Sequence, residues 1–263
     1  MERPAIRLRR VGCSIDGRAL LKDITWDIEP GSRWVVFGSN GCGKTTLLSL
    51  IAGYGNYDGS LEVDGIPLSS LDARQWRKEI SFVSGSFFGR VYHHETVLEI
   101  MAAAFRGTLG TPLDEMSPKE MQLIRALLET RGLVHKLDAS FDTLSKGEQQ
   151  MVLVLRALTQ KSAVFLLDEP MSGLDVAARA QLQRTIFSLA DQRDATVVYV
   201  SHHLEEISPR LFDKCLLLSR GRVVAQGPIR EVLASPEARK IIGEGAESYD
   251  DARALRDRGG DAK

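Results

Sequence analysis

The sequence has little of what marks a secreted or membrane-embedded protein. Its three cysteines, Cys13, Cys42 and Cys215, are spaced neither as a disulfide framework nor as a zinc site, so we expect reduced thiols and a cytoplasmic protein. No apolar run approaches the ~20 residues that a membrane-spanning helix requires. The arginines near the N-terminus are followed by no apolar segment, which argues against a secretory signal.

A strong net charge is also absent. With 34 Lys and Arg against 35 Asp and Glu, the net charge is −1. Proteins that bind nucleic acid or anionic lipid through bulk charge are usually more basic, so direct nucleic-acid binding is disfavoured. Apolar residues make up 43% of the 263 residues and charged residues 26%, which excludes a wholly disordered or fibrous chain.

The order of segments predicts an α/β fold. Short apolar runs bounded by turn residues predict strands over the first 84 residues, with one helix at 46–51. Residues 95–139 are rich in Leu, Ala, Met and Glu at helical spacing, which predicts an inserted helical subdomain. Strands and helices alternate after it, as in a parallel sheet covered by helices. The strands are expected at 6–11, 20–28, 34–37, 61–63, 66–68, 163–167, 196–200 and 215–219, and the later helices at 176–190 and 203–208.

The most specific segment is a glycine-rich stretch, Gly-Ser-Asn-Gly-Cys-Gly-Lys-Thr at 38–45, which fits the P-loop pattern. Glycines let successive backbone N–H groups turn toward phosphates, and the following helix start adds its unpaired N–H groups and positive dipole. Lys44 is expected to reach the β- and γ-phosphates, and Thr45 to bind Mg²⁺. A ligand-free strand-to-helix turn is the alternative. The predicted nucleotide contacts here are Gly38, Ser39, Asn40, Gly41, Cys42, Gly43, Lys44, Thr45 and Thr46.

Two carboxylates end the apolar run that begins at Val164. A buried strand would bring Asp168 and Glu169 to the carboxyl edge of the sheet, beside the P-loop. Asp168 suits a Mg²⁺ role, directly or through water, and Glu169 is placed to orient or deprotonate an attacking water. Such a strand end is commonplace alone, and gains meaning only when coupled to a P-loop.

A third segment, Leu-Ser-Lys-Gly-Glu-Gln at 144–149, precedes an apolar helix. Ser145 and Glu148 form a capping box, and an ordinary helix start is the alternative interpretation. Because this segment lies upstream of Asp168 in a P-loop chain, the sequence resembles the ATP-binding cassette (ABC) family, whose signature is similar to Leu-Ser-Gly-Gly-Gln. The Ser145 hydroxyl, the Gly147 N–H and the helix dipole would then form a second anion site.

The resemblance spans about residues 5–235 and implies a P-loop NTPase core with a parallel sheet, an N-terminal antiparallel β portion and an inserted helical subdomain. It implies an ATPase that uses ATP and Mg²⁺ and works as a head-to-tail dimer, with two ATP molecules at the interface. The implied catalytic residues are Glu169, His202 and Lys44, the metal ligands Thr45 and Asp168, the contacts to the partner's ATP Ser145, Lys146, Gly147, Glu148 and Gln149, and the subunit-bridging D-loop residue Asp175.

His202 ends a predicted strand in Tyr-Val-Ser-His, as the family's switch histidine does, and is favoured over its neighbour His203. The implied ATP-binding domain covers residues 1–242, with a core lobe of about 1–90 and 158–235 and a helical subdomain of about 91–157. The remaining 243–263 form a charged tail that we expect to be disordered.

Three positions depart from the family pattern. Ile15 stands where an aromatic residue usually stacks on adenine, so it offers apolar contact without a π face. The segment Ser84–Ser86 stands where the Q-loop glutamine is expected. Lys146 replaces the first signature glycine. The Phe-Val-Ser and Ser-His-His-Leu-Glu-Glu-Ile stretches resemble a subgroup associated with molybdenum transport or photorepair.

Two kinds of partner stay open. The first hypothesis is an ATPase subunit, as a homodimer or paired with a similar subunit, that drives a membrane permease and sits peripherally on the inner face of the cell membrane. The alternative is a non-transport ABC ATPase acting on a nucleic-acid or protein partner. The missing Q-loop glutamine favours the alternative, whereas a single cassette favours the transporter. A GTPase switch or a small-molecule kinase fits less well, because no Asn-Lys-x-Asp segment occurs and neither explains 145–149.

Overall fold

The computed structural model describes residues 5–110, 116–160, 162–192, 195–203, 206–207 and 211–242. The predicted tail over 243–263 lies outside this set. Within the described residues, no helix is both long enough and apolar enough to cross a membrane.

The first part of the chain forms a four-stranded antiparallel sheet in the order β2-β1-β4-β5. Residues facing inward alternate with exposed ones, as a sheet with one buried face requires. Asp-Gly pairs at 16–17 and 64–65 make the two hairpin turns with positive φ at both residues, the conformation that two-residue hairpins favour. The strands are β1 (Ile6–Ile15), β2 (Arg18–Ile28), β4 (Asp58–Val63) and β5 (Ile66–Pro67).

The second sheet has six strands in the order β10-β9-β3-β8-β7-β6. All neighbouring pairs are parallel except β9 with β10. The central strands β7 and β8 are buried along their whole length, which explains their continuous apolar sequences. The predicted α/β fold, with a parallel core and an antiparallel N-terminal portion, is confirmed. The strands are β3 (Arg33–Phe37), β6 (Ile80–Ser84), β7 (Val164–Asp168), β8 (Thr196–Ser201), β9 (Lys214–Ser219) and β10 (Arg222–Pro228).

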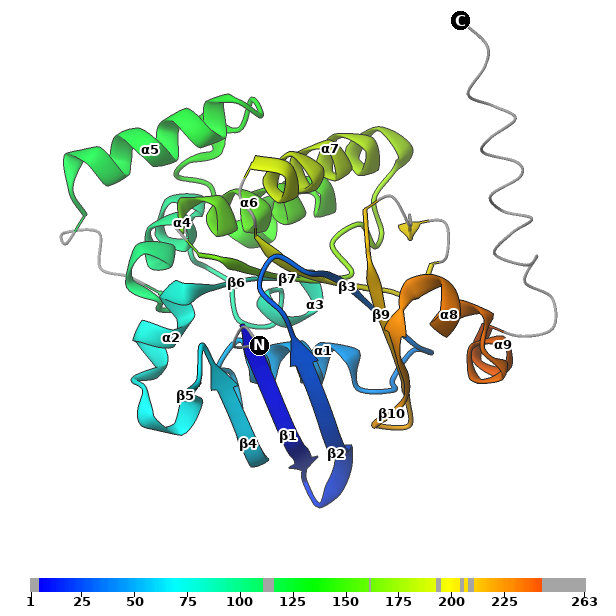
Figure 1. Cartoon of the computed structure of the whole chain (residues 1–263). Coiled ribbons are helices and arrows are strands. Elements are labelled where there is room, and N and C mark those ends of the chain that lie inside the picture. The colour runs from blue at the N-terminus through cyan, green and yellow to red at the C-terminus, as the bar shows by residue number, and fades with distance from the viewer. Residues whose placement is uncertain are drawn as a thin grey trace, which may run out of the picture.

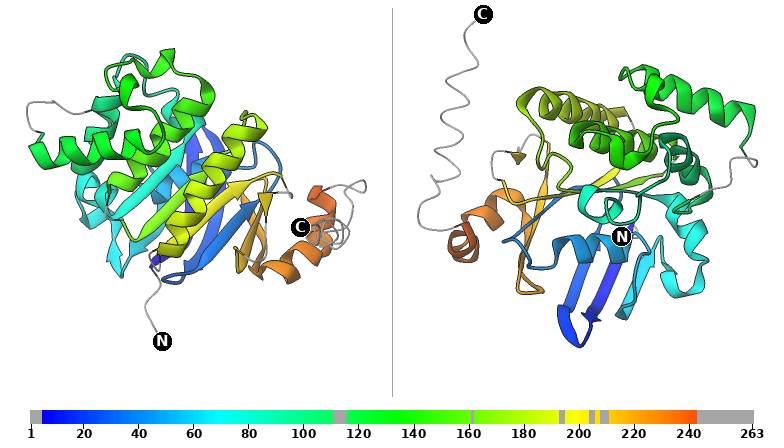
Figure 2. Two further views of the ribbon diagram at one scale, coloured as in Figure 1. Left: turned by 90° about the horizontal axis from the view of Figure 1, so that it is seen from above. Right: turned by 180° about the vertical axis from the view of Figure 1, so that it is seen from behind.

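Helices cover the parallel sheet on both faces. Figure 1 shows α1 (Lys44–Ile51) between the two sheets, with α6 (Lys146–Thr159) and α7 (Val176–Gln192) on the opposite face of the parallel sheet. Two further views show α4 (Val97–Arg106) and α5 (Pro118–Glu129) gathered with α6 at one end of the molecule (Figure 2). The shorter helices are α2 (Ala73–Glu79), α3 (Gly85–Phe88), α8 (Ile229–Ala234), α9 (Pro236–Ile242) and the 3₁₀ turns η1 (Leu68–Ser70), η3 (Val134–Lys136) and η4 (Phe141–Thr143).

Capping boxes start the three long helices of the 91–157 region. In each, a Ser or Thr side chain accepts from the N3 backbone and the N3 Glu side chain accepts from the capping residue's backbone. The predicted box at Ser145 is therefore confirmed as a structural feature. The boxes are Thr96–Glu99, Ser117–Glu120 and Ser145–Glu148.

The expectation of a single helix before residue 84 was wrong. Asp72 caps α2, in which only Trp76 is buried, so this helix has no apolar stripe for periodicity to reveal. Strand β10 was missed because its burial alternates but its sequence does not: Val223, Val224 and Ala225 are all apolar, and the strand ends in Gly-Pro. Half of the predicted helix over 203–208 (residues 204, 205 and 208) lies outside the described residues.

Candidate functional site

The P-loop occupies the connection between β3 and α1. Gly43 has φ +109, and a Cβ there would stand 2.8 Å from Leu21 Cδ2, so a larger residue would be both strained and crowded. A Cβ at Gly38 would collide with the carbonyl oxygen of Leu218. The rim residues 39–41 are exposed, which leaves their backbone open to a ligand.

Lys44 lies under this loop with only 5% of its surface exposed. Its Nζ donates to the carbonyl oxygens of Gly38 at 2.8 Å and Ser39 at 3.1 Å, and lies 3.8 Å from Glu169 Oε1. The ammonium is thus held at the mouth of the loop, beside the first turn of α1, where an anion would meet both the charge and the helix N-terminus.

Asp168 lies where three strand ends meet. It stands beside Ser84 on β6 and Val200 on β8, and it receives a hydrogen bond from the Thr45 hydroxyl at 3.1 Å. Burial raises the pKa of the Asp168 carboxyl, and the hydrogen bonds donated by Ser84 and Thr45 oppose that shift. The structure therefore brings together the two residues predicted to hold the metal, from segments more than a hundred residues apart.

The donors in this place suit Mg²⁺. Thr45 and Asp168 supply a hydroxyl and a carboxylate oxygen, the hard ligands that Mg²⁺ takes while keeping waters and substrate phosphates for its other positions. Among the described residues no cluster of three or more His, Cys, Asp or Glu could enclose a metal ion. Thr45 and Asp168 are the residues that could hold an ion here.

Glu169 and His202 form a pair at the next position along the edge. Glu169 Oε1 lies 2.9 Å from His202 Nδ1. The Glu169 backbone has φ +45, an uncommon conformation for a residue with a side chain, and its N–H donates to the Val200 carbonyl at 3.1 Å. Its carboxylate is thereby turned toward Lys44. The His203 ring lies against that of His202, with centroids 3.9 Å apart and the planes tilted by 40°.

The start of α6 is built differently. Ser145 and Lys146 are exposed. The Ser145 backbone N–H donates to the Glu148 carboxylate at 2.8 Å, and the Ser145 hydroxyl accepts from the Glu148 N–H at 3.3 Å. The hydrogen bond from the Ser145 backbone lowers the pKa of the Glu148 carboxyl. Gln149 donates to the Phe141 carbonyl at 2.9 Å and accepts from Lys146 at 3.3 Å. The Glu148 and Gln149 side chains thus hold the segment's shape.

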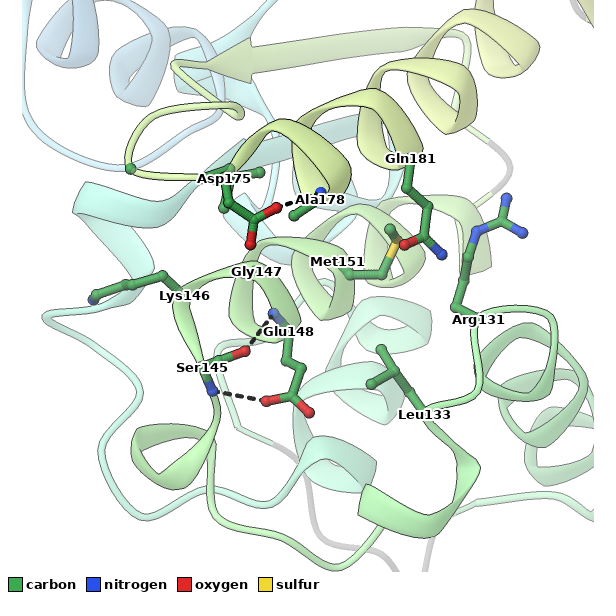
Figure 3. Close-up of a pocket in the computed structure, with 12 residues that line it drawn as sticks. Arg131, Leu133, Ser145, Lys146, Gly147, Glu148, Met151, Asp175, Ala178 and Gln181 are labelled. Atoms are coloured by element: carbon green, nitrogen blue, oxygen red, sulfur yellow. Dashed lines mark hydrogen bonds between the residues drawn. The ribbon is translucent and has the colours of Figure 1, made fainter.

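Asp175 and the start of α6 line one open cavity of about 430 Å³ (Figure 3). Asp175 caps α7 by accepting from the Ala178 N–H at 2.9 Å. Gly147 sits against Ala178, since a Cβ there would be 3.5 Å from the Ala178 Cβ. The cavity is lined by Arg131, Leu133, Ser145, Lys146, Gly147, Glu148, Met151, Gly173, Leu174, Asp175, Ala178 and Gln181.

The predicted site residues therefore fall into two groups. Lys44, Thr45, Asp168, Glu169 and His202 come together, whereas Ser145–Gln149 and Asp175 form a second group. In the described part of the chain, no hydrogen bond or ion pair joins the two.

Ile15 and Thr46 complete the predicted contacts. Ile15 ends β1 opposite Arg18 with 53% of its surface exposed, one of few large apolar side chains so open. Thr46 is half-buried in the first turn of α1. Sequence reasoning did not find the hydrogen bonds from Ser84 and Ser86 to Asp168, because nothing local signals that β6 lies beside β7.

The family follows from comparison with known proteins. The model of the family described as "ABC transporter" matches residues 21–172. This chain belongs to the ABC transporter family. A chain named as an uncharacterized ABC transporter ATP-binding protein, YlmA of Bacillus subtilis, is 36% identical over 236 residues, covering 87% of each chain. Spermidine/putrescine import ATP-binding protein PotA of Haemophilus ducreyi is 31% identical over 92% of this chain and 64% of its own.

A solved ABC structure has the same fold. CbiO1 of Clostridium perfringens, described as part of the ABC transporter complex CbiONQ, superposes with a TM-score of 0.68 over 97% of this chain and 100% of its own, at 22% identity. Proteins of this ABC family are ATPases, so the chain is an ABC-type, ATP-binding ATPase.

Proposed function

We propose that this ABC ATPase binds Mg-ATP at the Lys44–Asp168 group and closes as a dimer to drive a membrane permease. The observation that carries the proposal is the convergence of five polar side chains at one sheet edge. A second group, at the exposed start of α6, lies apart from the P-loop and is free to meet a nucleotide held by another subunit. The first group is Lys44, Thr45, Asp168, Glu169 and His202; the second begins at Ser145.

Binding uses the loop and the helix behind it. The backbone N–H groups of 38–45 and the Lys44 ammonium hold the phosphates, with Thr46 in the first helical turn. Ile15 gives the adenine ring an apolar contact. Thr45 and Asp168 hold Mg²⁺, which supplies Lewis-acid neutralisation of phosphate charge when bound.

Hydrolysis is assigned to the Glu169–His202 pair. A water oxygen bonds to the γ-phosphorus while the bond from that phosphorus to the bridging oxygen of ADP breaks, giving ADP and phosphate. Glu169 accepts the proton that the water loses. His202 lies 2.9 Å from Glu169 Oε1, so it fixes which way that carboxylate faces. Lys44 stabilises the charge that develops on the phosphates.

The partner subunit's nucleotide is assigned to the second group. Ser145 and Gly147 would offer a hydroxyl and a backbone N–H at a helix N-terminus, and Lys146 an ammonium. Glu148 and Gln149 act indirectly, through their bonds to the Ser145 and Phe141 backbone. Asp175, exposed in the same cavity, would bridge the subunits.

A permease is the proposed partner because relatives are named for transport: PotA as an import ATP-binding protein and CbiO1 as part of a transporter complex. The ATPase would then sit on the inner face of the cell membrane. A second candidate, a non-transport ATPase acting on protein or nucleic acid, is favoured by the serines and glycine at 84–86, where the family's glutamine is expected.

Glu169→Gln tests hydrolysis and dimerisation together. This variant should bind ATP as the wild type does, lose at least roughly 100-fold in turnover and accumulate as an ATP-bound dimer in sedimentation experiments. Wild-type turnover per subunit should fall on dilution. Undiminished turnover in Glu169→Gln, or a rate per subunit that is independent of dilution, would contradict the proposal. Co-expression with a neighbouring permease gene should move the protein into the membrane fraction, whereas the non-transport candidate requires that it stay out.

A further inference from the structure

Ser84 is buried completely at the carboxyl end of β6 and serves two structures at once. Its hydroxyl donates to Asp168 Oδ2 at 2.6 Å, the shortest bond that this carboxylate makes in the described residues. The same oxygen accepts from the Phe87 N–H at 3.2 Å, which caps α3. A displacement of the start of α3 would therefore change the hydrogen bond to the Asp168 carboxylate directly.

Ser86, two residues further along the chain, is exposed and approaches the same carboxylate oxygen. Its Oγ lies 3.5 Å from Asp168 Oδ2 and 3.2 Å from the Ser84 hydroxyl. Both serines thus approach Oδ2, while the Thr45 hydroxyl meets Oδ1. The two oxygens of Asp168 are distinguished by their partners, which fixes the rotation of the carboxylate.

Gly85, between the two serines, lies against a side chain of α6. A Cβ at this position would collide with the amide nitrogen of Gln150. Gln150 is 7% exposed, and its Oε1 is buried without a hydrogen-bond partner in the described structure. The amide therefore occupies the space that a side chain at 85 would need, so this loop packs closely on the helix that Ser145 caps.

A second contact fixes the same loop to α6. The fully buried Arg156 guanidinium lies 5.0 Å from the centre of the Phe88 ring, at the end of α3. Gln150 and Arg156 thus contact α3 near its two ends. Ser84, at its start, is placed beside Asp168 by the parallel pairing of β6 with β7.

We propose that Ser84 and Ser86 are positioning residues for Asp168, and that the Gln150 amide, packed against Gly85, limits where the two serines can lie. Two hydroxyls bond to Oδ2, so Oδ1, beside the Thr45 hydroxyl, would be the oxygen that holds the metal. The inference rests on the proposed role of Asp168 and Thr45 as Mg²⁺ ligands. It adds that the 84–86 segment and α6 orient the Asp168 carboxylate for that role.

The test compares metal binding with nucleotide binding. Ser84→Ala should weaken Mn²⁺ binding to the ADP complex, followed by electron paramagnetic resonance, by roughly tenfold, the loss expected when a ligand's hydrogen-bond partner is removed. ADP affinity measured in EDTA should be unchanged. Ser84→Thr keeps the hydroxyl and should restore metal affinity, and Ser86→Ala should have the smaller effect because its distance is longer.

Ser81→Ala is the matched control. Ser81 is also a buried serine of β6, but its hydroxyl bonds to Ala157, Gln160 and Ser162, away from Asp168. This variant should lower stability without changing Mn²⁺ affinity. Equal Mn²⁺ affinity in Ser84→Ala and wild type would overturn the proposal, as would an equal loss of ADP affinity with and without metal.

The contact between the Gln150 amide and Gly85 is tested by a single and a double substitution. Gly85→Ala should weaken Mn²⁺ binding because it meets the Gln150 amide, and Gly85→Ala/Gln150→Ala should recover most of it. No recovery would remove Gln150 from the proposal. Failure of the underlying site is distinguishable, because the wild type itself would then show no metal-dependent nucleotide binding.

Discussion

The two groups of candidate site residues differ in how they are held. Lys44 and Asp168 are buried and reach segments distant in the sequence, Lys44 through its ion pair with Glu169 and Asp168 through bonds from Ser84 and Thr45. The surrounding fold therefore determines their geometry. Ser145 and Asp175 are exposed and use bonds to residues three positions away. The first group is preorganised within one chain, whereas the second keeps a local shape and has an open face.

This difference explains why one chain would need a second. Preorganised donors stabilise charge because they need no rearrangement when a phosphate arrives. An exposed helix start gains little from an anion while water competes for it, and more once a second surface excludes that water. The cavity over α6 and α7 is therefore expected to become effective only on closure (Figure 3).

The largest expected effect is a loss of ATP binding when the lysine of the first group is removed but not when the lysine of the second group is removed. Lys44→Ala removes an ammonium held at 5% exposure against the loop, and should weaken ATP binding by roughly 100-fold, or about 2.7 kcal/mol. Lys146→Ala removes an exposed ammonium and should leave ATP binding to the monomer unchanged. Fluorescent-nucleotide titration at dilute protein measures both. Equal losses in the two variants would erase the distinction.

A pair of capping serines sharpens the comparison. Ser145→Ala and Ser117→Ala remove the same kind of cap, from α6 and α5, and each should cost about 1 kcal/mol, or roughly 2–4 °C in Tm. Only Ser145→Ala should also lower turnover at saturating ATP, by roughly tenfold, because Ser117 lies outside the cavity. Calorimetry and phosphate release measure the two effects. A matching loss of turnover in Ser117→Ala would mean that Ser145 acts only through stability.

The sequence predicted the elements whose signals are local. The glycines of 38–43, the Asp168–Glu169 strand end and the Ser145 capping box each carry their own pattern within a few residues. The bonds from Ser84 to Asp168 and the fit of Gln150 over Gly85 depend on strand order and on the placement of α6, which no local window contains. Helix α2 was not predicted for a different reason: a short helix with one buried residue has almost no hydrophobic periodicity to detect.

Asp168→Asn should separate stability from ligand binding at the preorganised group. Because burial raises the pKa of Asp168 in the folded protein, its contribution to stability is full below the ordinary Asp pKa of about 3.9 and is lost as pH rises through the folded value. The neutral amide avoids that loss, so the nucleotide-free variant should have an equal or higher Tm at pH 7.5. Mg-ATP should raise the Tm of the wild type more than that of the variant. A lower nucleotide-free Tm would contradict this account.

The smallest effect concerns the carboxylates of two of the three capping boxes, those of α5 and α6. Hydrogen bonds from the Ser145 and Ser117 backbones lower the pKa values of Glu148 and Glu120, so both stabilise the fold above the ordinary Glu pKa of about 4.3 and lose that contribution as pH falls through the folded values. Glu148→Gln and Glu120→Gln should each flatten the loss of stability below pH ~4.3 in urea titrations. The flattening should be larger for Glu120→Gln, because Glu120 also accepts two hydrogen bonds from Arg106 at 3.2 Å, whereas the Lys136 ammonium lies 3.9 Å from Glu148. An acid response in Glu148→Gln as steep as that of the wild type would show that the local bonds at α6 do not hold this carboxylate in solution.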